Sequence, residues 1–374
     1  MECMPLSPTS CLFTYLGGLL LLNLKVGEDE ITSDKDYKHV MKRLRHAHLR
    51  PSGVSIGGVQ ITPSVLRSHL EENGCSASQI NNLLNITDKQ DVTTMFNLMQ
   101  LIWWLPPPLA TANPIFHKAC IALNQHSKLL RYLILPYIDV NMSLHDQLKY
   151  LSAAAHLAYV FFTQNNTRSA YLPSLLYRDI QIMVKNAFFC VAKMKRDKPD
   201  GEFYLILLGT NRLEWIFGLI RSQKGSDVNL QGLSVAGGIE QKVDHLNPAS
   251  WKGDVRISRV QLMSAWRSGR ELVEHDPELA TFKPAEKFNA MESIPSANLL
   301  NPFGMEGYED RECEETHDGM PQQAQSTPST PLIPNTLELE ELVDSDIAEK
   351  HGLESTIDMG NGKHVHKAKR QNVS

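Results

Sequence analysis

The sequence predicts an α/β protein in which a large helical block interrupts a smaller core of strands and helices. Residues 19–26 (LLLLNLKV) are continuously apolar and precede a turn-like GEDE, which is typical of a buried strand. An almost entirely helical pattern follows over residues 62–195. The apolar run EFYLILLGT then predicts a second strand, and NRLEWIFGLIRS predicts a helix after it that Asn211 can cap.

The segment SDKDYKHVMKRLRHAHL predicts a helix directly after the first strand. Ser33 or Asp34 can cap its start, and Val40, Leu44 and Ala47 recur at helical spacing. The other face is basic and carries Lys38, Lys42, Arg43 and Arg45. A solvated face is the commoner explanation for such a pattern, and contact with nucleic-acid phosphates is the alternative.

Helix start and stop signals divide the middle of the chain. TPSVLRSHLEENG has Pro63 in its first turn and Gly74 near its end, and SASQINNLL opens with the capping-box pair Ser76 and Gln79. VTTMFNLMQLIWWL is stopped by three prolines at 106–108. SLHDQLKYLSAAAHLAYVFF is apolar on most faces, which places it at the centre of a bundle. PSLLYRDIQIMVKNAFFCVAKMK predicts another long amphipathic helix.

We expect five segments along the chain. They are a leader at 1–17, the first part of the core at 18–60, the helical insertion at 61–198, the second part of the core at 199–276 and a tail at 277–374. The tail combines a low-complexity stretch (QQAQSTPSTPLIPN) with an acidic one (TLELEELVDSDIAEK), so we expect most of it to be disordered.

The composition bounds the class of protein. A chain of 374 residues with 42% hydrophobic residues can bury a real core, and a net charge of −5 gives no global reason to bind nucleic acid. Six scattered cysteines without a CxxC pair argue against zinc and disulfide frameworks. The apolar run at 12–24 is too short to span a membrane, and the start lacks the basic residues of a signal peptide. We expect a nuclear or cytoplasmic protein that is neither secreted nor membrane-bound.

Two acids occupy places where a catalytic metal could be held. Asp36 follows the first predicted strand, and Glu214 lies on the helix after the second. Carboxylates that converge from separate elements can bind Mg²⁺ for phosphoryl transfer. From spacing alone, the ordinary preference of acids for helix starts is the favoured explanation. An amphipathic surface helix with Asn211, Gly218 and Arg221 on one face explains Glu214 equally well.

Two other patterns have simpler explanations. SVLRSHLEENGCSASQINNLL could form a helix-turn-helix in which Gln79, Asn81 and Asn82 read bases, but its second helix is not basic. A helix pair within a bundle is the commoner reading. His156, in AAAHLAY, is most simply a buried histidine with a hydrogen bond.

The same two acidic segments resemble a known family. DYKHVMKRLR resembles the D-x-x-H-x-x-K-x-x-R segment of transposases of the P-element and THAP-domain group, and LEWIFGLIR resembles their L-E-x-x-F-x-x-x-R segment. Longer stretches, among them DEITSDKDYKHVMKRLR, LSAAAHLAYVFF and FYLILLGTNRLE, are closer still to fungal proteins of transposon origin. The resemblance covers roughly residues 18–260.

The resemblance implies a ribonuclease-H-like core that is interrupted by a helical insertion. It gives Asp36 the role of the second catalytic carboxylate and Glu214 that of the third, so the two should share an Mg²⁺ ion. His39, Lys42 and Arg45 match basic residues beside the second acid. With Lys38, they form the set expected to contact nucleic acid.

Two departures shape the functional expectation. The family's first acid lies on an earlier strand, but only 35 residues precede Asp36, and Asp29 and Asp34 are too close to it. The family's N-terminal DNA-binding module is missing as well. We therefore expect a domesticated or decayed fragment of a DDE-type transposase that is inactive alone. Any activity left would be Mg²⁺-dependent DNA strand cleavage or transfer. The alternative is a non-enzymatic helical module that binds protein or DNA partners.

Overall fold

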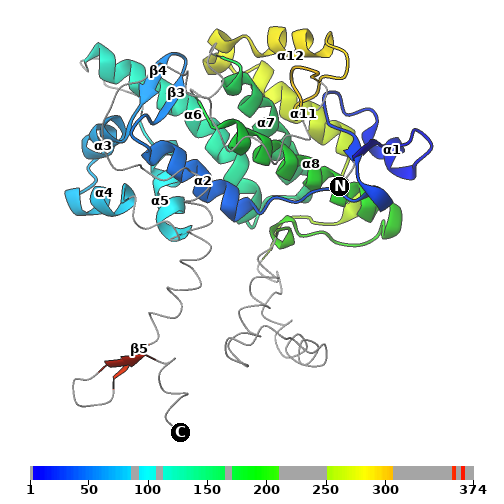
Figure 1. The fold of residues 1–374 in the computed structure, drawn as a ribbon, viewed down its shortest axis with the longest axis horizontal. Coiled ribbons are helices and arrows are strands. Elements are labelled where there is room, and N and C mark those ends of the chain that lie inside the picture. Colours follow the sequence, from blue (N-terminus) through cyan, green and yellow to red (C-terminus); the bar gives the residue numbers. More distant parts are fainter. Residues whose placement is uncertain are drawn as a thin grey trace, which may run out of the picture. The chain divides into compact units, whose positions relative to one another are not determined.

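The computed structural model describes residues 3–85, 92–106, 113–164, 171–209 and 251–305, together with the backbone of two short strands, β5 (Thr356–Asp358) and β6 (His364–His366). The chain divides into two compact units, Met1–Met305 and Glu306–Ser374. The described part of the first unit is mostly helical with a few short strands (Figure 1).

The helices account for most of the described chain. Their bounds are α1 Cys11–Leu16, α2 Tyr37–Leu49, α3 Pro63–Glu72, α4 Ala77–Leu83, α5 Val92–Trp103, α6 Pro114–Ile138, α7 Leu144–Phe162, α8 Ser174–Asp197, α11 Leu262–Glu274 and α12 Pro284–Glu292. Short 3₁₀ turns lie at Glu28–Glu30, Leu205–Leu207, Ile257–Arg259 and Pro277–Phe282. The helical block predicted for residues 62–195 is confirmed wherever the structure describes it.

Helix α7 lies at the centre of the first unit, as its apolar sequence predicts. Every side chain from residue 151 to 162 is buried, and the helix packs against α6, α8 and α11 (Figure 1). The closest approach is to α11, at Gly269. A Cβ atom at that position would lie 2.5 Å from the Lys149 carbonyl oxygen and 2.5 Å from the Ser152 Cβ. The absence of a side chain at Gly269 therefore sets the spacing of this helix pair.

The predicted capping signals operate in the structure. Thr62 accepts a hydrogen bond from the Val65 N–H at the start of α3. Ser76 and Gln79 form the reciprocal capping box of α4. These side chains satisfy N–H groups that have no partner inside a helix, so both helix starts follow from local sequence.

Both strands predicted for the core are wrong. Residues 19–21 form a bend and a turn, residues 22–24 have no regular structure, and only β2 (Lys25–Val26) is a strand, paired antiparallel with β1 (Met4–Pro5). In the second predicted strand, Glu202 makes a single bridge to Arg256 before the turn at Leu205–Leu207. The apolar side chains of Leu19, Leu22 and Leu205 are nevertheless buried. A short apolar run shows that a segment is buried, but it does not fix the backbone conformation that buries it.

A β-hairpin occurs where no strand is expected from the sequence. The strands β3 (Val54–Ile56) and β4 (Val59–Ile61) pair antiparallel across Gly57 and Gly58. Both glycines have positive φ, 57° and 77°, as the favoured two-residue hairpin turn requires. The signal was present in the sequence as a Gly-Gly pair between two short apolar runs.

The ends of the first unit are better packed than expected. The leader expected at 1–17 contains α1, whose Leu12 and Leu16 are buried in the core. Order does not end at residue 277, because Phe282 and Phe288 are buried as well. The described part of the unit continues to residue 305, and the low-complexity stretch lies outside the described residues. Within the described part of the chain, no helix has an apolar stretch long enough to cross a bilayer.

Candidate functional site

Asp36 caps the start of α2 with its side chain. Its Oδ1 atom accepts hydrogen bonds from the N–H groups of Lys38 (2.7 Å) and His39 (3.4 Å). A carboxylate at this place satisfies free N–H groups and complements the positive end of the helix dipole. The expectation that Ser33 or Asp34 caps the helix is therefore wrong. Asp36 is also buried, with 7% of its surface exposed.

The segment that leads toward Glu214 lies against the start of α2. The Gly209 N–H donates a hydrogen bond to Asp34 Oδ2 at 2.9 Å. Gly209 has a φ of +93°, and a Cβ atom there would lie 2.8 Å from Asp36 Oδ2. Two segments far apart in sequence thus meet at Asp34 and Asp36. Glu214 itself lies outside the described residues, so its proximity to Asp36 stays a prediction.

Replacing Gly209 with alanine should both strain the backbone and push against the Asp36 carboxylate. A positive φ costs an L-residue about 1–2 kcal/mol, and the contact with Asp36 adds to that. We expect Gly209→Ala to destabilise more than Gly74→Ala. Gly74 has a similar φ of 78°, but a Cβ atom added there would have nothing within 4 Å. Urea unfolding of both variants measures the difference, and equal losses would contradict the contact.

A buried carboxylate on α8, Asp179, was not identified from the sequence. It is 2% exposed and forms ion pairs with Arg43 of α2 and with Lys35, whose Nζ lies 3.2 Å from Asp179 Oδ1. A buried carboxylate is unfavourable unless cationic groups compensate it. In the sequence Asp179 directly follows Arg178 in a long amphipathic helix, and that pattern does not mark it as a buried ion-pair partner. Asp179 therefore holds α2 and the segment before it against α8.

Two tyrosines form an aromatic contact beside the Asp36 cap. Tyr37 of α2 stacks on Tyr137 of α6, with ring centroids 4.1 Å apart. Burial, with a further contribution from the Asp36 charge, raises the pKa of Tyr37 to about 12. Burial also raises the pKa of Tyr137 well above its usual value, and the charge of Asp34 adds to it. Both hydroxyls therefore stay protonated at neutral pH, next to a negatively charged helix start.

The predicted nucleic-acid set divides between the surface and the interior. His39 is exposed and its Nδ1 lies 3.7 Å from Asp36 Oδ1, whereas Lys38 and Lys42 are half-buried. Arg45 is only 2% exposed. Its Nη2 donates hydrogen bonds to the carbonyl oxygens of Leu83 (3.1 Å) and Asn85 (3.0 Å) at the end of α4.

The prediction that Arg45 contacts nucleic acid is wrong for this reason. Its guanidinium group donates hydrogen bonds to carbonyl groups at the C-terminal end of α4, where positive charge is favourable. An Arg at helical spacing from Lys38 and Lys42 is not necessarily on the solvent face, because its long side chain can turn inward.

The other end of α2 carries a buried hydrogen-bonded chain. His48 Nδ1 lies 2.6 Å from the Leu44 carbonyl oxygen, and His48 Nε2 contacts His126 Nε2 of α6. His126 Nδ1 in turn lies 3.0 Å from the Tyr171 hydroxyl. All three contacts can be hydrogen bonds if both imidazoles are neutral. His48 Nδ1 then donates to Leu44, His126 Nε2 donates to His48 Nε2, and the Tyr171 hydroxyl donates to His126 Nδ1. Burial lowers the pKa of His48 to about 4 and that of His126 well below its usual value.

His156 is buried and hydrogen-bonded, as the sequence predicts. Its Nδ1 lies 2.8 Å from the Ser152 carbonyl oxygen, and its ring packs edge-on against Trp266 and Phe288. Burial lowers its pKa to about 3. The residue therefore belongs to the apolar contact between α7, α11 and α12.

The acids of the site do not form a ready metal centre within the described residues. No group of three or more His, Cys, Asp or Glu side chains there is placed to hold a metal ion. Asp36 presents hard oxygen atoms of the kind that Mg²⁺ prefers, but its expected partner is Glu214. The predicted Mg²⁺ site is therefore neither assembled nor excluded by the described residues.

Comparison with protein-family models, with curated proteins and with solved structures gave no match. The function is therefore argued from the contacts around Asp36.

Proposed function

We propose that the chain derives from a DDE-type transposase whose ribonuclease-H-like core carried a helical insertion, and that it does not cleave DNA alone. One observation supports this most directly. Gly209, which lies four residues before the LEWIFGLIR segment, touches Asp34 and Asp36, so the residues that lead into the second transposase-like segment meet the start of the first. A catalytic core of this class needs such a meeting of its acidic segments.

Asp36 and Glu214 are the residues that would hold Mg²⁺. A bound metal would activate the nucleophile and stabilise the leaving oxygen of a phosphodiester. Asp36 Oδ1 already accepts two N–H groups, which fixes the carboxylate in place and leaves Oδ2 on the side of Gly209. The proposed lack of activity rests on the sequence, in which two of the three carboxylates of the family are identified.

Binding of Mn²⁺ tests this proposal separately from catalysis. We expect weak Mn²⁺ binding by electron paramagnetic resonance, and a loss of at least about tenfold in affinity for Asp36→Asn and for Glu214→Gln. Asn caps a helix as well as Asp does, so Asp36→Asn removes the charge while the start of α2 stays intact. Nicking of duplex DNA should stay at background in all three proteins.

Two results would contradict the proposal. Mn²⁺ binding that is unchanged in both variants would remove the metal role of Asp36 and Glu214. Nicking by the wild type that Glu214→Gln abolishes would show an active enzyme instead of a remnant. An upstream reading frame that encodes a strand with a further Asp would favour the active form.

A non-enzymatic interaction module is the second candidate, and one observation favours it. Trp104 at the end of α5 and Ile115 at the start of α6 expose 70% and 78% of their surfaces. Large apolar side chains exposed this far are typical of contact sites when they cluster. Capture of a partner from a nuclear extract that Trp104→Ser reduces would support this function. A monodisperse wild type that captures nothing would count against it.

A further inference from the structure

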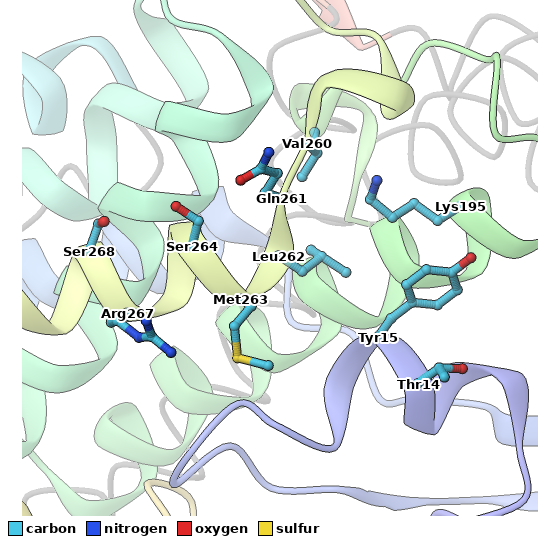
Figure 2. A pocket seen from close by; sticks show the side chains of 10 residues that line it. All are labelled: Thr14, Tyr15, Lys195, Val260, Gln261, Leu262, Met263, Ser264, Arg267 and Ser268. Carbon is cyan, nitrogen blue, oxygen red and sulfur yellow. The ribbon is translucent and has the colours of Figure 1, made fainter.

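A surface depression of about 580 Å³ lies between α1, the last turn of α8 and the start of α11 (Figure 2). Its lining comes from three separate parts of the chain: Thr14 and Tyr15, then Lys195, then residues 260–264 with Arg267 and Ser268. It is separate from the Asp36 site in its lining residues. An occupant would therefore contact the N-terminal segment and α11 together.

The charged groups that line this depression are all positive. Lys195 and Arg267 are among the lining residues, whereas no Asp or Glu is. Lys195 Nζ donates a hydrogen bond to the Ile257 carbonyl oxygen at 3.0 Å. Neither cation forms an ion pair with any residue that the structure describes. Burial also lowers the pKa of Lys195.

Residues with neutral hydrogen-bond donors also line the depression. They are Tyr15, Ser264 and Ser268; Tyr15 lies on the same side as Lys195, whereas Ser264 and Ser268 lie along α11 with Arg267 (Figure 2). The first N–H groups of a helix have no partner within it. At α11 the preceding side chain, Gln261, does not cap them. These groups supplement the cations as donors for an anion.

We propose that this depression binds a small ligand through its phosphate group. A phosphate offers several strong acceptor oxygens to ammonium, guanidinium and hydroxyl donors that approach from different directions. A polymer would need a longer track of cations to be held by its backbone phosphates, and the lining supplies two cations. The ligand would stabilise the contact between α1 and α11. This inference does not depend on a transposase origin.

Titration of the full chain with inorganic phosphate tests the proposal. Isothermal calorimetry at constant ionic strength, with sodium chloride as the reference salt, should show saturable binding. Lys195→Gln and Arg267→Gln should each weaken it by about tenfold or more, since a charge-assisted hydrogen bond contributes about that much. The matched controls are Lys193→Gln on the same helix and Arg259→Gln in the turn before α11, which should change affinity less than twofold. Circular dichroism verifies the fold of each variant.

Three results would overturn the proposal. The first is the absence of saturable phosphate binding. The second is binding that the control substitutions weaken as much as the pocket substitutions do. The third is a wild type that binds duplex DNA but not phosphate, with DNA binding lost in Lys195→Gln and Arg267→Gln, since the depression would then contact a nucleic-acid backbone.

Discussion

Lowering the pH from 7 to 5 is expected to remove about 5–6 kcal/mol from the free energy of unfolding. His48, His126 and His156 are fully buried, and burial lowers the pKa of each. In the unfolded chain they titrate near pH 6.5. Below that pH the unfolded state binds more protons than the folded state does. The free energy of unfolding therefore falls as the pH falls. Each histidine contributes about 2 kcal/mol over this range.

A loss of this size is comparable to the whole stability of an ordinary domain. Urea unfolding at pH 7, 6 and 5 measures it, and the slope of stability against pH gives the number of protons taken up. His156→Leu should lower that number by about one between pH 6 and 5. A slope that His156→Leu does not alter would show that other groups cause the acid sensitivity.

Gly269→Ala is expected to destabilise the protein by about 1–3 kcal/mol, because overpacking at a close contact costs this much. The new Cβ would meet the Lys149 carbonyl oxygen at 2.5 Å and the Ser152 Oγ atom at 2.6 Å. The carbonyl belongs to the α7 backbone and cannot move aside without shifting the helix. The sign of the stability change is informative, because a Gly→Ala substitution in a helix without such a contact stabilises the protein by about 1 kcal/mol.

Glu271→Ala provides the matched control for this substitution. Glu271 lies on the exposed face of α11, so its replacement should change stability by less than about 0.5 kcal/mol. Thermal and urea unfolding of both variants separate a contact effect from a general effect on α11. A stabilised Gly269→Ala protein would mean that α7 and α11 are farther apart than the structure places them.

Local signals predicted the helices because the interactions that start and stop a helix are themselves local. The capping box at Ser76 and the stop near Gly74 needed only neighbouring residues. The buried position of α7 followed from apolar residues on most of its faces. The runs at 19–26 and 202–210 were different, because a strand needs a partner strand that the run itself does not specify.

The candidate site was predictable only in part for a similar reason. Asp36 was identified as a candidate, but the cap of the helix was expected two or three residues earlier, at Ser33 or Asp34. The inward turn of Arg45 and the pairing of Asp179 with Lys35 and Arg43 depend on how α2 lies against α4 and α8. Such contacts between distant segments leave no regular spacing in the sequence.

The capping role of Asp36 affects how the history of this chain can be read. A residue that starts a helix remains under selection for stability after any selection for chemistry has ended. Cap replacement by Asn or Ser preserves the helix but abolishes a metal ligand, whereas Glu keeps the charge but is not among the residues that cap well. Under the proposed metal role, Asn or Ser at this position in homologous chains would mark a lineage that kept the fold alone, whereas Asp is compatible with either role.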